Sequence, residues 1–165
     1  YKSALTTGKS SMNESDITIG PALSKSDQRA VKALFIEYSN WLPVNLDFQD
    51  FNMEMNVFPK GYDCLLLAKR AGTPVGAVGL RAHNKTTCEM KRLFIKQEAQ
   101  GLGLGRSISL HLMQEAKALG FQEMVLDSLK RLKPAVKLYR SLGFTEIEPY
   151  NFNPEDDVIY MRRDL

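Results

Sequence analysis

The chain has 165 residues, the length of one domain with a sizeable core, and 44% apolar and 25% charged residues are ordinary for a soluble globular protein. The formal net charge of +3 is small and the basic residues are dispersed, so we expect no nucleic acid as partner. No apolar run approaches the roughly 20 residues that a helix needs to cross a bilayer, so we expect no membrane partner either.

The first part of the chain predicts an arm, a strand and two helices. Residues 1–15 are rich in Ser, Thr, Lys and Gly, which predicts a flexible N-terminal arm before a single domain over residues 16–165. Alternation over residues 16–19 predicts a strand. A helix pattern with Ser26 as its N-cap continues to about residue 42. A shorter helix with a bulky apolar face is expected over residues 48–58.

The rest of the chain alternates between strand and helix patterns. Helices are predicted over residues 104–119 and from Pro134 to Gly143. The expected strands lie at residues 65–68, 75–80, 87–95, 124–126, 144–147 and 158–161. This order of elements predicts an α/β fold in which a central mixed β-sheet has helices on both faces.

A glycine-rich segment, residues 100–107, joins the strand that ends near Ile95 to the following helix. Closely spaced glycines let the backbone approach a ligand, and the first amides of the helix are unpaired donors at a positive dipole end. The junction therefore predicts a phosphate-bearing ligand. The dinucleotide pattern G-x-G-x-x-G fails because Arg106 or Ile108 stands at its last position, and the phosphate loop of NTPases is absent.

The pattern Gln100-x-x-Gly103-x-Gly105 resembles the signature of the GCN5-related N-acetyltransferase (GNAT) family, Arg/Gln-x-x-Gly-x-Gly/Ala between a strand and a helix. The family's second hallmark is matched by Ala135-x-x-Leu138-Tyr139-x-x-x-Gly143-Phe144. The resemblance covers about residues 16–165. It implies the GNAT-like acyl-CoA N-acyltransferase fold and transfer of an acetyl group from acetyl-CoA to a primary amine, by direct attack in a ternary complex.

In this family the glycine loop holds the pyrophosphate of acetyl-CoA, and the strand before it pairs with the pantetheine arm. One backbone amide of that strand would also polarise the thioester carbonyl. The resemblance thus implies that acetyl-CoA is bound by Leu93, Phe94, Ile95, Gln100, Gly101, Leu102, Gly103, Leu104, Gly105, Arg106 and Ser107.

Acetyl transfer requires that the amine lose a proton and that the leaving thiolate gain one. Tyr139 matches the position where many family members carry the acid that protonates the thiolate; its alternative role is packing in the core. Glu89 lies on the central strand, where the histone-modifying branch of the family places a catalytic glutamate, so it is the candidate base. The alternative for Glu89 is an ion pair with Arg81, Lys91 or Arg92.

The central strand also carries two adjacent cations. Strict alternation would place Lys91 and Leu93 on one face, and Met90, Arg92 and Phe94 on the other. Buried charges need partners, so one cation could hold a carboxylate of the acceptor, and structural ion pairing is the alternative. The substrate candidates are Arg81, Lys91, Arg92 and Ser128.

The acceptor is a small-molecule or peptide amine, and its wall should come from residues 38–62 and 148–157. Asp127 and Ser128, at the end of the strand over residues 124–126, could order a water or contact the pantetheine, or could simply form a turn.

Two other classes stay open, a silent acyl-CoA-binding sensor and an interaction module on the same fold. The first residues carry no secretory signal, and the two cysteines make no metal spacing. We therefore expect a cytoplasmic protein without a metal, as a monomer or a homodimer.

Overall fold

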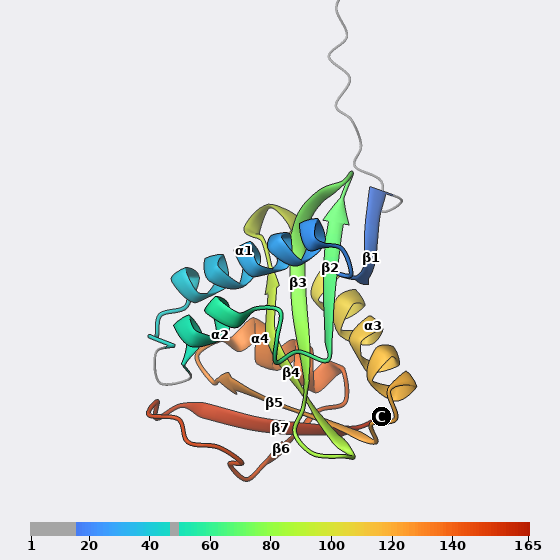
Figure 1. The fold of residues 1–165 in the computed structure, drawn as a ribbon. Helices are drawn as coiled ribbons and strands as arrows, with labels where there is room; N and C mark the ends of the chain where they lie inside the picture. The colour runs from blue at the N-terminus through green and yellow to red at the C-terminus, as the bar shows by residue number, and fades with distance from the viewer. Residues whose placement is uncertain (1–15, 47–49) are drawn as a thin grey trace, which may run out of the picture.

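The computed structural model describes residues 16–46 and 50–165, so the arm predicted for residues 1–15 lies outside the described residues. Within the described ranges, seven strands form one sheet in the order β1-β2-β3-β4-β5-β7-β6 (Figure 1). β4 and β5 run parallel, and the other neighbours run antiparallel. The strands are β1 (Ile17–Pro21), β2 (Cys64–Arg70), β3 (Thr73–Ala82), β4 (Thr87–Ile95), β5 (Glu123–Leu129), β6 (Thr145–Ile147) and β7 (Val158–Asp164).

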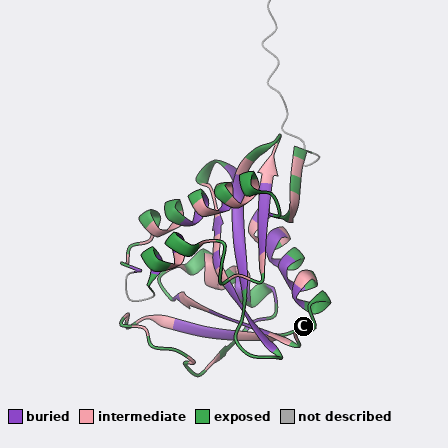
Figure 2. Ribbon diagram, viewed as in Figure 1, coloured by how far each residue is buried: buried purple, intermediate pink, exposed green. Residues whose placement is uncertain are grey.

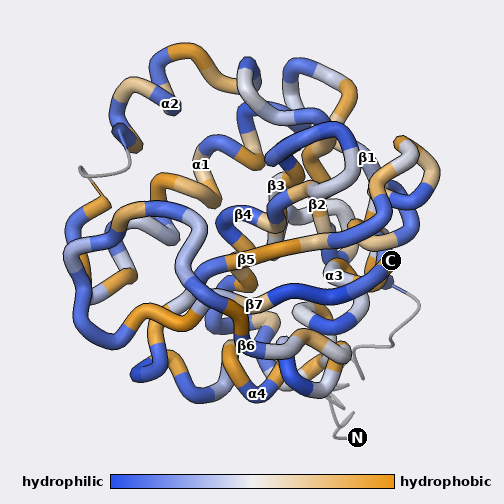
Figure 3. The backbone as a smooth tube through the Cα atoms, turned by 90° about the horizontal axis from the view of Figure 1, so that it is seen from below, coloured by the Kyte–Doolittle hydropathy of each residue, from blue (hydrophilic) through white to orange (hydrophobic). Residues whose placement is uncertain are grey.

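Helices cover both faces of this sheet, which confirms the predicted fold class. α1 and α2 lie on one side of the strands and α4 lies on the other (Figure 3). α3 packs on the same core as α4. The helices are α1 (Lys25–Trp41), α2 (Phe51–Val57), α3 (Leu104–Ala118) and α4 (Lys133–Ser141), and a short 3₁₀ turn η3 (Gln97–Ala99) precedes α3.

The buried residues concentrate on the central strands and on the helix faces that meet them (Figure 2). Under α3 and α4, the fully buried Ile108 and Leu112 pack with Leu80 and Met124. On the opposite face, Phe35 of α1 is fully buried in a second cluster. The sheet is therefore held between two apolar layers, and its central strands have little freedom to move.

The first helix begins two residues earlier than the sequence predicted. Ser24, and not Ser26, is the N-cap, because its side chain accepts a hydrogen bond from the Asp27 amide at 3.0 Å. Its carbonyl oxygen accepts the amide of Gln28 and so starts the helical ladder. Both serines are suitable caps, and the backbone turn after Ala22, which pairs with β2 through Leu65, decides between them.

The register between β3 and β4 shifts at Arg92. Gly79 pairs with Lys91 and Ala77 pairs with Phe94, so β4 contains one more residue than β3 over this interval. Arg92 itself has a φ of 58°, in the left-handed region that side chains other than glycine rarely adopt. This is a β-bulge, which bends a strand and changes the direction of the following side chains.

The strict alternation predicted for β4 is wrong beyond Lys91 because of this bulge. Leu93 packs against the core under α3, as Met90 does. Phe94 belongs to the core under α1, and Arg92 reaches α2 on that same side. The extra residue therefore places Arg92 and Lys91 on one face of the strand.

The close approach of Tyr62 to β3 gives a test of this packing. A Cβ added at Gly79 would lie 2.4 Å from the Tyr62 ring, whereas a Cβ at Gly20 of β1 would meet nothing within 4 Å. We expect Gly79→Ala to lower the free energy of unfolding in urea by about 1–3 kcal/mol through overpacking. Gly20→Ala is the matched control, and its free energy of unfolding should be unchanged or slightly higher than that of the wild type. Equal effects of the two variants would contradict the packing described here.

Candidate active site

A cleft opens in the middle of the sheet, where β4 and β5 separate. Their paired residues run only from Thr87 and Glu123 to Glu89 and Val125, although both strands continue beyond this point. The cleft is lined from both strands, from the end of α1 and from the segment before β7. Its lining residues are Tyr38, Leu42, Val44, Leu46, Met90, Lys91, Arg92, Asp127, Ser128, Leu129, Leu132, Asn153 and Glu155.

The glycine loop lies between β4 and the N-terminus of α3. Gly101 and Gly103 have φ values of 83° and 74°, which explains why glycine stands at both positions. A Cβ on either residue would meet no atom within 4 Å, so the loop faces open space. Gly103 caps α3 without a side-chain hydrogen bond, and the first turn contains no acidic residue. The first amides of α3 and the positive end of its dipole are therefore presented to an anion.

The remaining residues of the loop fix its position. Gln100 donates a side-chain hydrogen bond to the Ile95 carbonyl at 3.1 Å, which ties the loop to the end of β4. A Cβ at Gly105 would lie 3.1 Å from the Leu138 side chain, so glycine allows α3 and α4 to approach each other. Arg106 donates to Ser141 at 3.3 Å across the same pair of helices. The structure thus brings both sequence hallmarks together.

Tyr139 points from α4 into the protein and is buried, with its ring edge-on to Phe144. Among the described residues no hydrogen bond partner contacts its hydroxyl group. Burial raises the pKa of Tyr139 well above its usual value, and electrostatic interactions with Tyr38 and Asp127 add to this effect. The hydroxyl therefore stays protonated at neutral pH and is free to donate.

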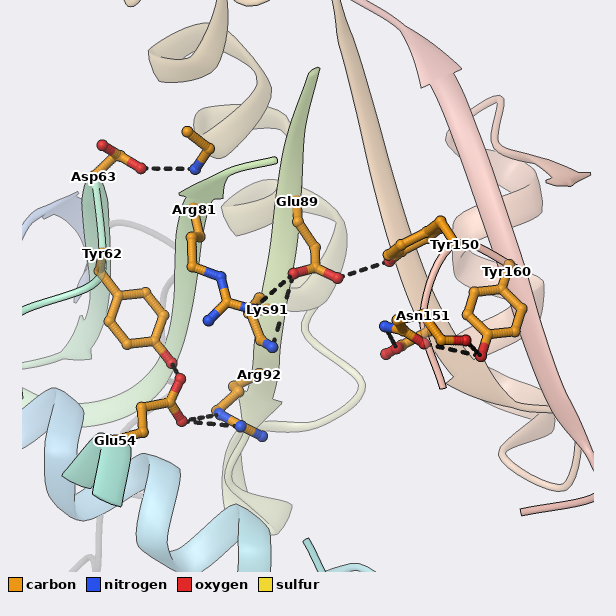
Figure 4. Close-up of polar contacts among 12 residues, drawn as sticks. Glu54, Tyr62, Asp63, Arg81, Glu89, Lys91, Arg92, Tyr150, Asn151 and Tyr160 are labelled. Carbon is orange, nitrogen blue, oxygen red and sulfur yellow. Dashed lines mark hydrogen bonds and ion pairs between the residues drawn. The ribbon is translucent and has the colours of Figure 1, made fainter. Parts of the chain in front are cut away.

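Glu89 lies at the point where β4 and β5 separate, and donors surround its carboxylate (Figure 4). Arg81 and Lys91 approach Oε1 at 3.3 and 3.7 Å, and the Tyr150 hydroxyl donates to Oε2 at 2.7 Å. Both carboxylate oxygens are engaged, so these contacts match the ion-pair alternative for Glu89. Burial lowers the pKa of Lys91, and the nearby Glu89 carboxylate opposes this shift.

Arg92 is held by Glu54 of α2 in a buried ion pair of 2.9 Å (Figure 4). The side chains are only 4% and 13% exposed, and Tyr62 donates a further hydrogen bond to Glu54 at 2.7 Å. The guanidinium group also lies 4.9 Å from the centre of the Phe51 ring. The contacts of Arg92 therefore match structural ion pairing, the alternative to binding a substrate carboxylate.

The segment between β6 and β7, residues 148–157, closes one side of the cleft. Asn151 donates to Asp127 at 3.0 Å, and its side-chain oxygen accepts the Tyr160 hydroxyl at 2.9 Å. Arg131 binds Glu155 and Asp157 at 2.6 and 2.7 Å, which holds the segment near the end of β5.

Of the predicted site residues, Lys91, Arg92 and Ser128 line the cleft itself, whereas Glu89, Tyr139 and the glycine loop are not among its lining residues. Residues of both segments expected to form the acceptor wall also line the cleft. Sequence reasoning missed Glu54 and Tyr150, which contact the site from distant elements and carry no motif. For Asp127 the sequence left open a turn, an ordered water or a contact with the pantetheine, and its place beside the cleft depends on the divergence of β4 and β5.

The comparisons with known proteins agree with this geometry. The acetyltransferase (GNAT) family matches residues 29–144. An uncharacterized N-acetyltransferase of Schizosaccharomyces pombe is 36% identical over 93% of this chain and 98% of its own length. An uncharacterized N-acetyltransferase of Dictyostelium discoideum is 30% identical over 90% of this chain and 99% of its own length. The chain belongs to the GNAT family of acetyltransferases.

Solved structures show the same fold. An acetyltransferase from Streptococcus agalactiae superposes with a TM-score of 0.72 at 21% identity, covering 91% of this chain and 99% of that one. The protein yncA of Salmonella typhimurium, solved with its cofactor acetyl-CoA, gives a TM-score of 0.67 at 22% identity, with 90% and 93% covered. In the described part of this chain, every helix is too short or too polar to cross a membrane.

The buried ion pair under the cleft leads to a prediction about stability. We expect Arg92→Met to lower the free energy of unfolding by about 3–5 kcal/mol, because Glu54 is left as a buried charge without its cation. The double variant Arg92→Met/Glu54→Met should lose less of its free energy of unfolding than the single variant, because no unpaired charge is left buried. Chemical denaturation measures both.

The exposed pair of Lys96 and Glu37, 3.6 Å apart, is the control, and Glu37→Gln should change the stability by less than about 1 kcal/mol. A comparable small change for Arg92→Met would show that the Arg92–Glu54 pair does not hold α2 on the sheet.

Proposed function

We propose that this protein transfers an acetyl group from acetyl-CoA to a primary amine of a small-molecule or peptide acceptor. The observation that supports it most is the position of the cleft, which opens between β4 and β5 on the side of the sheet where β4 leads into the glycine loop. A long ligand can lie along β4 with its phosphates at α3 and its reactive end in the cleft. The acceptor would enter from the side formed by the end of α1 and residues 148–157.

The donor substrate would be bound by the residues that the sequence predicted for acetyl-CoA. Its pyrophosphate would be held by residues 100–107, where two glycines with positive φ and the free first turn of α3 accommodate an anion. The backbone of Leu93, Phe94 and Ile95 follows the bulge on the separated part of β4 and is available to the pantetheine arm. Acetyl-CoA would supply the activated acetyl group, and a β4 amide would polarise its carbonyl.

Tyr139 is the proposed proton donor for the departing thiolate. Its hydroxyl is protonated at neutral pH and makes no hydrogen bond that would have to break among the described residues. When the nitrogen–carbon bond forms and the carbon–sulfur bond breaks, the proton passes from Tyr139 to sulfur. The proton that the nitrogen loses returns through solvent to the tyrosinate.

The role of Glu89 as the base stays a prediction. Its carboxylate links Arg81 and Lys91 to Tyr150, so the contacts favour a role in which Glu89 holds residues 148–157 against β4. A direct catalytic role would require one of these donors to be displaced when the acceptor binds.

Calorimetric titration with acetyl-CoA, with NADPH as the control, tests the donor site. We expect binding at one site for acetyl-CoA alone, followed by thiol release when a suitable primary amine is added. Absence of both heat and a thermal shift with acetyl-CoA would contradict the proposed function.

Tyr139→Phe separates binding from chemistry. With an amine that the wild type acetylates, we expect kcat to fall by a factor of about 10²–10⁴, the usual contribution of general acid catalysis. The acetyl-CoA affinity and the thermal stability should stay unchanged, because the hydroxyl makes no hydrogen bond within the described structure. Unchanged turnover would remove Tyr139 from the mechanism and favour a structural role for its ring.

A further inference from the structure

The carboxylate of Asp127 borders the cleft from the β5 side, across from Met90 and Lys91. We propose that Asp127 binds the acceptor amine in its ammonium form and so selects cationic amines rather than acceptors that present a carboxylate. This inference rests on the proposed function, because it gives the acceptor a place beside the donor.

The orientation of Asp127 is fixed by a chain of hydrogen bonds that runs from Tyr160 through Asn151 to Asp127. The Asn151 side-chain amide donates to Oδ2 of Asp127 at 3.0 Å. The Tyr160 hydroxyl of β7 contacts the side-chain and backbone oxygens of Asn151 at 2.9 and 3.1 Å (Figure 4). Asn151 can thus offer only its N–H group to Asp127. One carboxylate oxygen is held, and the carboxyl plane is set by the rest of the fold.

The second oxygen of Asp127 has no such contact. In the described ranges, Asn151 provides the only hydrogen bond to the carboxylate of Asp127, and no Lys or Arg lies within ion-pair distance of that carboxylate. The other acidic residues near the cleft are all matched with cations. Glu89 is paired with Arg81 and Lys91, Glu54 with Arg92, and Glu155 with Arg131. Asp127 is therefore the carboxylate that an external cation would neutralise.

The charge of Asp127 reaches the reaction centre. Burial is the main reason why the pKa of Tyr38 is raised to about 12, and the Asp127 carboxylate adds to this increase. The same two causes raise the pKa of Tyr139. The Asp127 carboxylate acts in the same direction on the pKa of Tyr150 and Tyr160. A cation bound at Asp127 would thus lie within electrostatic range of Tyr139, the proposed proton donor.

The cations beside the cleft do not provide an equivalent site for an anion. Lys91 and Arg92 line the cleft, but each already faces a carboxylate, Glu89 and Glu54 respectively. An acceptor carboxylate would have to compete with these internal partners. An acceptor ammonium meets an oxygen that is already oriented and free.

Coenzyme A derivatives that carry the charge on their sulfur test this without knowledge of the natural acceptor. The probes are S-(2-aminoethyl)-CoA, the neutral S-propyl-CoA and S-(2-carboxyethyl)-CoA, with affinities measured by calorimetry near neutral pH. The wild type should bind the aminoethyl derivative about tenfold more tightly than the propyl derivative, and the carboxyethyl derivative most weakly. Asp127→Asn should abolish the preference for the ammonium and leave the affinity for S-propyl-CoA unchanged.

Asp156, an exposed carboxylate in residues 148–157, provides the matched control. Asp156→Asn should keep the wild-type preference for the aminoethyl derivative. Equal affinity of the wild type for the aminoethyl and propyl derivatives, or a preference that survives Asp127→Asn, would overturn the proposal. Tightest binding of the carboxyethyl derivative would assign the site to an acceptor carboxylate held by Lys91 and Arg92. If none of the three derivatives binds, the donor site itself is wrong and the proposed function fails with it.

Discussion

The bulge at Arg92 is the feature on which the rest of the site depends. A residue with a side chain in the left-handed region costs about 1–3 kcal/mol and persists only when its surroundings hold it. The surroundings here are Glu54, the Phe51 ring and the packed face of α2. The pairing of β4 with β5 ends at Glu89, and the bulge follows at Arg92 in the separated part of β4, where the cleft opens inside a sheet that is otherwise continuous. The Arg92–Glu54 ion pair therefore connects β4, the strand proposed to bind the donor, to α2.

Charge is distributed in the site in a consistent way. Most carboxylates near the cleft are neutralised by a cation of the protein, which keeps them in place and removes them from competition for a ligand. The glycine loop presents amides and a helix dipole without an acidic residue, and it suits an anionic ligand. Asp127 faces the other end of the cleft with an oriented oxygen. Under the proposed function, the glycine loop would receive the phosphate-bearing donor and Asp127 the amine, so the two ligands would meet groups of opposite charge.

Much of this fold was predictable from the sequence because its signals are local. The glycines at 101 and 103 indicate positive φ, the apolar spacing indicates α3, and the two family hallmarks indicate the fold class. The sequence predicted Ser26 as the N-cap of α1, but the backbone turn after Ala22 makes Ser24 the cap. The failures concern non-local contacts. Alternation cannot reveal a bulge, since the extra residue is defined only against β3, and it therefore placed Arg92, Leu93 and Phe94 on the wrong faces. The sequence predicted Arg81 and Lys91 as partners of Glu89, but Tyr150, which also contacts Glu89, and Asn151, which contacts Asp127, come from the segment between β6 and β7, far away in sequence.

The proposed function requires that acetyl-CoA lie along β4 with its phosphates at the N-terminus of α3. Amide hydrogen exchange, measured by NMR with and without acetyl-CoA, reports on the backbone groups involved. At a ligand concentration about a hundredfold above Kd, we expect the amides of Leu93–Ile95 and of the first turn of α3 to exchange up to about a hundredfold more slowly, and NADPH to have no such effect. Protection confined to other surfaces, such as the groove between α1 and α2, would contradict the placement of the donor in the cleft between β4 and β5.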